Sequence, residues 1–289
     1  MNRASKKRFA FLFPATFLIF VFFLIPAALC ILYSFTNLAL SGENAQQLRF
    51  IGLTNYAKML GDSNVIKAMK NTLYFTFGSI LGQSIIGFMT AYLVRGKQIW
   101  IRRTVGILIM AGWIIPETVA AYCMSAFFSD KGTLNIITGF LGARPVSWLF
   151  KYPMAAVVIA NIWRGTAGSM INYQAALDNL DNAVLEAAAI DGCNGMNKLL
   201  RVVLPIMRQP IATNTMLITL STLGSFGLIW IMTAGGPGGK TNTFSVLMYL
   251  KAFQNHQLGY GVAISMVLMV VGVIFGIAYT KILKGSDEK

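Results

Sequence analysis

Long apolar segments alternate with short polar segments along the whole chain. An α-helix needs about 20 apolar residues to cross the hydrocarbon core of a bilayer. Six segments approach or exceed that length: 9–33, 71–94, 104–128, a segment that follows 148–153 and ends near 177, 205–233 and 260–283. The pattern therefore predicts an all-α integral membrane protein with six transmembrane helices.

Composition supports this prediction and excludes a soluble protein. Of the 289 residues, 56% are hydrophobic and 12% are charged, and the mean hydropathy is +0.63. Such a chain cannot cover itself with polar surface. The net charge of +14 does not indicate nucleic acid, because the basic residues cluster at the ends of apolar segments. Membrane lipid headgroups are the expected partner of these residues.

The residues that usually carry catalysis or metal binding are scarce. Cys30, Cys123 and Cys193 are odd in number and lack metal-ligand spacing, and His256 is the only histidine. We therefore expect no catalytic residue, no metal and no cofactor in this chain.

A polar stretch, 178–204, separates the fourth and fifth apolar segments. Within it, 183–190 contains strong helix formers and neither Gly nor Pro, with Asp181 or Asn182 as the N-cap and Gly192 as the C-terminal stop. So short a helix is not stable alone in water. We expect it to dock into a groove on another protein.

This stretch resembles the cytoplasmic coupling loop of binding-protein-dependent importer permeases, the membrane subunits of ATP-binding-cassette transporters. The family pattern is Glu-Ala-Ala, three residues, Gly, nine residues, then Ile or Val, any residue, and Leu-Pro. The competing interpretation, an Ala-rich helix that packs on its own protein, leaves the fixed spacing unexplained. The resemblance assigns ATPase coupling to Glu186, Ala187, Ala188, Asp191, Gly192, Leu204 and Pro205.

Topology follows from the distribution of Lys and Arg. Basic residues concentrate next to the spans in the N-terminal segment, in 95–103, in 198–208 and at the C-terminus. The positive-inside rule then places both termini and the coupling loop in the cytoplasm. We predict a cytoplasmic segment 1–8, a transmembrane domain 9–283 with the coupling loop at 178–204, and a cytoplasmic tail 284–289, in a bacterial cell membrane.

Two outer segments, 50–56 and 233–241, resemble turns of the carbohydrate branch of this family. The first contains Gly-Leu-Thr-Asn-Tyr and the second contains Thr-Ala-Gly-Gly-Pro. The second also fits a relaxed phosphate-loop pattern. We reject that interpretation, because a phosphate loop follows a strand and this segment follows a predicted membrane span.

Two ionisable residues, Glu117 and Arg164, lie inside predicted spans. Intramembrane charges are costly and are functional candidates by default. Each lies 13 residues from the cytoplasmic end of its span, which at 1.5 Å per residue puts both about 20 Å deep. Two interpretations stay open: the residues line a translocation cavity, or they serve only the structure, as a buried pair or with the arginine snorkelling outward.

The family resemblance extends to sugar-contacting positions of maltose-type permeases. It implies a substrate pathway through Trp163, Arg164, Gly165, Gly224, Ser225 and Phe226, to which we add Glu117. Gly224 lacks the side-chain amide of the maltose case, which argues against maltose itself. Arg164 suits either an acidic or phosphorylated carbohydrate or the hydroxyl groups of a neutral one. Plain packing remains the alternative for Trp163 and Phe226.

The resemblance thus implies a permease subunit of an ATP-driven importer. Its implied partners are a second homologous permease, two subunits that bind ATP and Mg²⁺, an extracytoplasmic solute-binding protein and a carbohydrate. The alternatives are a proton-coupled secondary carrier with Glu117 as relay and a membrane scaffold without transport. The first lacks signs of inverted repeats and leaves the coupling stretch unexplained, and the buried charges argue against the second.

Overall fold

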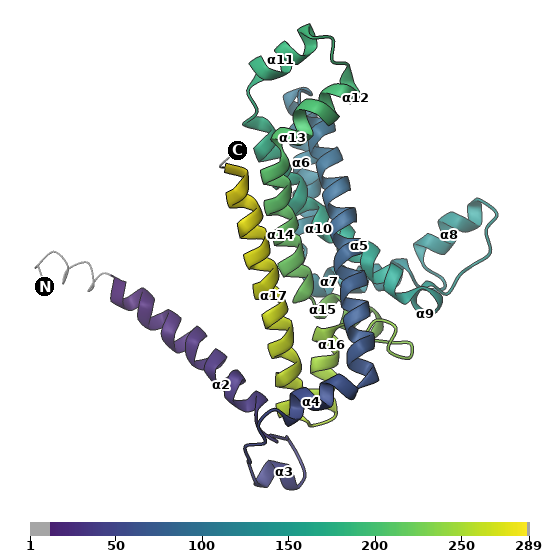
Figure 1. Ribbon diagram of the computed structural model, residues 1–289. Coiled ribbons are helices and arrows are strands. Elements are labelled where there is room, and N and C mark those ends of the chain that lie inside the picture. Colours follow the sequence, from purple (N-terminus) through teal and green to yellow (C-terminus); the bar gives the residue numbers. More distant parts are fainter. Residues whose placement is uncertain (1–11, 288–289) are drawn as a thin grey trace, which may run out of the picture. The chain divides into compact units, whose positions relative to one another are not determined.

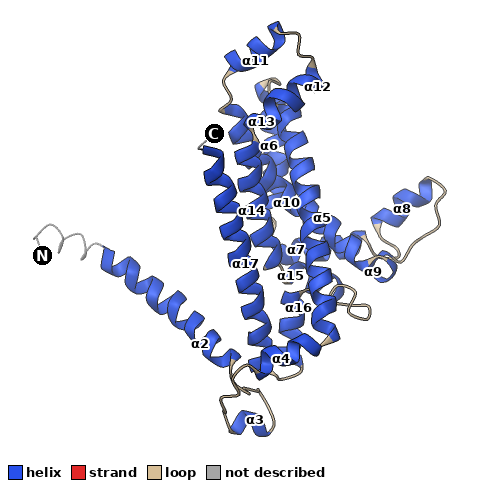
Figure 2. Ribbon diagram, viewed as in Figure 1, coloured by secondary structure: helices blue, strands red, loops and turns tan. Residues whose placement is uncertain are grey.

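The computed structural model describes residues 12–287 and is built from helices (Figure 1). No strand occurs in this part of the chain, where Thr36 and Phe50 form an isolated bridge (Figure 2). Four helices are long and apolar enough to cross a membrane, or up to six if each bent pair is one span. The predicted all-α membrane architecture is confirmed. The predicted cytoplasmic segment 1–8 lies outside the described residues.

The chain forms two compact units, the first from residues up to 66 and 247–270, the second from 67–246 and 271 onward. The first unit holds η1 (Phe20–Leu24), α2 (Ile25–Ser34), α3 (Glu43–Gln46), α4 (Thr54–Gly61) and η3 (Leu250–Gln254). The second holds α6 (Ile99–Ile114), α7 (Glu117–Phe127), α8 (Thr133–Phe140), α9 (Trp148–Lys151), α10 (Pro153–Asp178), α11 (Asn182–Ile190), α12 (Gly195–Lys198), η2 (Leu199–Val203), α13 (Leu204–Ile206), α14 (Arg208–Leu223) and α15 (Gly227–Thr233). Three helices run through both: α5 (Ser63–Val94), α16 (Phe244–Tyr249) and α17 (Leu258–Asp287).

In the first unit, buried polar side chains tie α4 to the end of α2. Asn55 Nδ2 donates to the carbonyl oxygens of Ser34 and Thr36, at 2.9 Å each. Tyr56 donates its hydroxyl to Ser34 Oγ at 2.8 Å. The segment 37–70 is rich in polar residues, yet α3, α4 and the first turns of α5 lie there. These hydrogen bonds hold α4 in place despite its polar sequence.

In the second unit, glycines of α5 allow close approach to α10. A Cβ at Gly78 would lie 3.0 Å from Val158 Cγ1, and one at Gly82 would overlap the Ile162 side chain. Small residues spaced four apart allow such close approach of two membrane helices. On α17, a Cβ at Gly272 would lie 4.0 Å from Leu220 Cδ2, and one at Gly276 would meet no atom of the described residues within 4 Å.

Two predicted spans are broken helices. α6 and α7 are bent by 98°, and α14 and α15 by 51°. Pro116 lacks an N–H and forces Ile115 into an extended conformation, with ψ of 125°. The second break falls between Leu223 and Gly227, where Gly224 ends α14. The predictions of continuous helices over 104–128 and 205–233 were therefore wrong.

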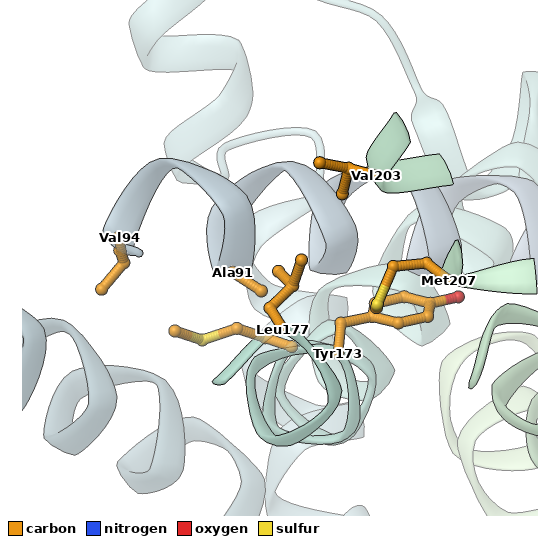
Figure 3. Packing of buried hydrophobic residues seen from close by; sticks show 7 residues of the cluster. Ala91, Val94, Tyr173, Leu177, Val203 and Met207 are labelled. Carbon is orange, nitrogen blue, oxygen red and sulfur yellow. The ribbon is translucent and has the colours of Figure 1, made fainter. Parts of the chain in front are cut away.

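A buried hydrophobic cluster joins α5, α10 and the η2–α13 segment (Figure 3). Leu185 of α11 and Leu199 of η2 pack against it. Figure 1 shows α11 and α12 at the end of the second unit's bundle. The cluster therefore fastens the base of the polar stretch to the long helices. Its members are Ala91, Val94, Met170, Tyr173, Leu177, Val203 and Met207.

In the first unit, a mostly buried carboxylate joins the α4–α5 turn to η3 and α17. Asp62 Oδ2 accepts from Lys251 Nζ and from the Tyr260 hydroxyl, both at 3.0 Å. The Asp62 side chain is 13% exposed. Burial raises the pKa of Asp62, but hydrogen bonds from Lys251, the Asn64 backbone and Tyr260 outweigh it and lower the pKa from 3.8 to about 2.

We expect Asp62→Asn to lower the thermal stability of the protein. Since the folded pKa of about 2 lies below the ordinary 3.8, the carboxylate stabilises the fold above pH 3.8, and this is lost as pH falls through 2. The shift corresponds to about 2 kcal/mol. Thermal unfolding in detergent, followed by intrinsic fluorescence, should show a gap between the two proteins at pH 7 that closes between pH 3.8 and 2. The exposed Asp130→Asn is the control, and a gap that persists at pH 2 would contradict the prediction.

Candidate functional site

A cavity of about 550 Å³ lies within the second unit. Residues of α5, α6, α7, α10, α14 and α15 line it. Its lining combines one acid and one base with three serines, the rings of Trp113 and Phe226, and four side-chain amides. The amides belong to Gln83, Asn161, Asn172 and Asn214. Such a lining offers many neutral hydrogen-bonding groups between apolar helices.

Glu117 lies where the two broken helices meet. It is the first residue of α7, directly after Pro116. Its Oε1 accepts a hydrogen bond of 2.8 Å from the backbone N–H of Leu228, at the start of α15. Gly227 leaves room for this contact, because a Cβ there would lie 3.0 Å from Oε1. One carboxylate therefore connects the two breaks.

Arg164 of α10 faces the same carboxylate. Its Nη1 lies 3.7 Å from Glu117 Oε2, and each of the two side chains is about one-third exposed, at 33% and 34%. Arg164 Nε is buried and lacks a hydrogen-bond partner among the described residues. The structure thus brings together the two intramembrane charges. The sequence prediction counted 13 residues from 104 to 117, and the break between α6 and α7 falls only at the end of that count.

The amides crosslink the helices around the cavity. Gln83 Nε2 of α5 donates to the Asn161 carbonyl at 3.1 Å, and Asn161 Nδ2 donates to Ser79 Oγ at 2.8 Å. Gly165 makes space for Gln83, since a Cβ at Gly165 would overlap its amide. On the other side, Asn172 Nδ2 of α10 donates to Asn214 Oδ1 of α14 at 3.0 Å.

The cavity gathers six of the seven predicted pathway residues and excludes Trp163. The six are Glu117, Arg164, Gly165, Gly224, Ser225 and Phe226. Trp163 lines a separate apolar groove beside Ile159 and Ile162 and is 45% exposed. This corrects the prediction that Trp163 faces the same space as Arg164. Neighbouring residues of an α-helix point about 100° apart, and Trp113 supplies an aromatic ring instead.

The four side-chain amides were not among the predicted pathway residues, although the sequence carries a signal for three of them. Asn161, Arg164, Gly168 and Asn172 are spaced by three and four residues and therefore share one face of α10. Asn214, Ile218 and Ser221 do so on α14. A polar stripe along an apolar helix marks such a face.

The predicted coupling helix forms at its expected position as α11. Asp181 is the N-cap, and its Oδ1 accepts from the Ala183 N–H at 2.9 Å. Gly192 ends the helix with a positive φ of 77°, and the Cys193 N–H bonds back to the Ala188 carbonyl at 3.0 Å. Most of α11, including Glu186, is exposed. Leu204 and Pro205 lie in α13.

The segment 233–241 forms a hydrogen-bonded turn. The hydroxyls of Thr233 and Thr241 lie 2.7 Å apart, and Thr241 donates to the Gly236 carbonyl at 3.1 Å. Lys67 Nζ donates to the Gly238 carbonyl at 2.6 Å. Helix α15, not a strand, precedes the turn, as expected from our rejection of a phosphate loop.

Comparison with known proteins gives one family match. The model of the family described as "Binding-protein-dependent transport system inner membrane component" matches residues 83–285. The chain is 30% identical over 239 residues to the trehalose/maltose transport system permease protein of Thermococcus litoralis, covering 81% of this chain and 79% of that one. It is 28% identical over 271 residues to an sn-glycerol-3-phosphate transport system permease protein of Salmonella typhi, covering 90% and 88%.

Solved structures show the same fold. A chain of a bacterial alginate ABC transporter, in complex with an alginate-bound periplasmic protein, superposes with a TM-score of 0.82 at 19% identity, covering 96% of this chain and 93% of that one. A chain of the methionine transporter MetNI in an inward-facing conformation gives 0.57 at 17% identity, covering 76% and 95%.

We expect Glu117→Leu to destabilise the fold and Glu117→Gln to preserve most of its stability. Leucine removes the acceptor of the buried Leu228 N–H, and an unpaired buried donor costs about 1–3 kcal/mol. Glutamine retains an Oε1 that accepts the same bond. Thermal unfolding in detergent should rank wild type and Glu117→Gln above Glu117→Leu, with the exposed Glu43→Leu as control. Equal melting of the Leu and Gln variants would contradict a structural role for this bond.

Proposed function

The chain belongs to the binding-protein-dependent transport system inner membrane components, and from this premise we propose that it is the permease subunit of an ATP-driven carbohydrate importer. The observation that carries the proposal is a polar cavity inside the apolar helices of the second unit. The same unit presents the exposed, capped helix α11, to which we assign the coupling role. Such a subunit needs a cavity that binds the solute and a helix that contacts the ATPase subunit.

The lining of the cavity supports carbohydrate as the solute. Amides and hydroxyls, as at Asn161, Asn172 and Ser225, pair with sugar hydroxyls, while Trp113 and Phe226 offer flat apolar faces. The trehalose/maltose permease that resembles this chain agrees with this chemistry. Neither the comparisons nor the cavity supports the proton-coupled alternative, since Glu117 is engaged by Arg164 and Leu228.

The chain itself hydrolyses nothing in this proposal. Two partner subunits bind and hydrolyse ATP with Mg²⁺, and a second, homologous permease completes the membrane core. With both termini and 178–204 in the cytoplasm, segments 50–56 and 233–241 face outward. An extracytoplasmic binding protein delivers the solute on that side.

Coupling runs from α11 into α10. Leu185 packs on the cluster that contains Tyr173 and Leu177 of α10. At the connection between the two helices, Arg95 Nη2 donates to the Leu180 carbonyl at 3.3 Å, and Arg102 pairs with Asp178. A displacement of α11 by the ATPases therefore moves α10. Since α10 carries Asn161 and Arg164, the displacement reshapes the cavity.

We expect Glu186→Lys to release the ATP-binding subunit. Glu186 is exposed on α11, and its charge reversal removes one contact at the groove and adds a repulsion. A loss of 1.4 kcal/mol lowers affinity about tenfold. The test is mass spectrometry of proteins that co-purify with the chain from detergent-solubilised membranes, together with ATP-dependent sugar uptake. Glu43→Lys, exposed in α3, is the matched control. A well-folded wild type that never carries an ATPase would refute the importer assignment.

A further inference from the structure

We propose that the cavity accepts a carbohydrate without net charge, and that Glu117 determines this specificity by cancelling the charge of Arg164. The inference rests on the proposed transport function and adds the chemical class of its substrate. From the sequence alone, Arg164 suited acidic and neutral carbohydrates equally well. The position of Glu117 distinguishes the two.

The charges of the cavity sum to zero. Among the residues that line it, Glu117 and Arg164 are the charged ones, with opposite signs. Their side chains meet at 3.7 Å. An anionic group drawn to the guanidinium therefore meets the Glu117 carboxylate at a similar distance, so attraction and repulsion nearly cancel. A neutral hydroxyl feels no such opposition.

Glu117 is held in this position by the fold. Its Oε1 accepts from the Leu228 N–H at 2.8 Å, and Leu228 is 1% exposed. An anion that displaced the carboxylate from Arg164 would strain this hydrogen bond or leave the buried N–H unpaired, which is unfavourable. The counter-charge of Arg164 is therefore a fixed part of the cavity.

The remaining free groups suit hydroxyl ligands. Arg164 Nε, Ser169 Oγ and Asn214 Nδ2 are buried without hydrogen-bond partners among the described residues. All three residues line the cavity, and Ser169 and Asn214 are each 2% exposed. Buried polar atoms of this kind normally have a partner. Each of the three atoms carries a donor hydrogen, and a hydroxyl oxygen that reaches it when the cavity opens accepts from it without bringing a charge.

The first test measures the charge of the cavity with thiol reagents of opposite sign. Ser221 lines the cavity and is exposed. Ser221→Cys is introduced into the full-length chain after Cys30, Cys123 and Cys193 are replaced by Ser. The rates of modification by an anionic and a cationic methanethiosulfonate are compared in detergent. Ser225→Cys serves as the second reporter position where Ser221→Cys does not fold.

We expect the anionic-to-cationic rate ratio to respond to each charge separately. Glu117→Gln retains the acceptor for Leu228 but exposes the charge of Arg164, and should raise the ratio about tenfold. Arg164→Met should lower it, and the double variant should restore the starting ratio. A ratio that Glu117→Gln leaves unchanged, or a starting ratio that already favours the anionic reagent tenfold, overturns the proposal.

The second test uses solutes as protectants of the same thiol. Trehalose should slow the modification more than sn-glycerol 3-phosphate does, and Glu117→Gln should reverse that order. Stronger protection by the phosphate ester in the unaltered cavity overturns the proposal. These readouts need neither ATP nor partner subunits, so they separate the two ideas. ATP-driven uptake of an acidic carbohydrate would support the importer function and refute the proposal of a neutral substrate. A cavity without net charge in a protein without ATP-driven uptake would support the proposed charge balance and refute the importer function.

Discussion

The hydrogen bond between the Glu117 carboxylate and the Leu228 N–H is the contact on which the cavity depends. Inside a bilayer, backbone groups freed by a helix break must find partners in the protein, because lipid offers none. The break between α14 and α15 frees groups on both sides, and Ser245 Oγ donates to the Leu223 carbonyl at 2.9 Å. Glu117 accepts from the other side. The side chains of Glu117 and Ser245 replace backbone hydrogen bonds that the break removes. The helices can therefore break at this point, and the cavity lies beside the break.

Helix α10 links this cavity to α11. One of its faces carries Asn161, Arg164 and Asn172 into the cavity. Tyr173, directly after Asn172, and Leu177, a little more than one turn further on, enter the hydrophobic cluster (Figure 3). Because the two sets lie on one continuous helix, the cavity and the base of α11 cannot move independently. A rigid helix between two sites is a physical route for coupling that requires no chain of small adjustments.

Structural features that depend on residues close in the chain, such as helix ends, were predicted from the sequence. Features that depend on contacts between distant residues, such as the helix breaks, were not. The bounds of α11 follow from Asp181 and Gly192, which cap a helix through local bonds. The apolar segments also follow, because hydropathy averages over about 20 residues. That averaging hides the breaks at Pro116 and Gly224, and the acceptor that stabilises the second break lies 111 residues away in the chain. Which side chains face the cavity depends on how each helix is rotated about its axis, and hydropathy does not determine that rotation. The prediction therefore placed Trp163 in the cavity and omitted Asn214.

The two carboxylate oxygens of Glu117 have different roles, because Oε1 accepts a backbone hydrogen bond and Oε2 faces Arg164. The ion pair of Oε2 with Arg164 is one-third exposed and long, at 3.7 Å, and pairs of this kind contribute little to stability. The bond of Oε1 to a buried N–H is short, and an unpaired donor there is costly. Stability therefore depends mainly on Oε1, and the electrostatics of the cavity depends on the charge that faces Arg164. An amide at this position keeps the acceptor for the Leu228 N–H but not the negative charge, so the stability of the fold and the charge of the cavity can be changed separately at this one side chain.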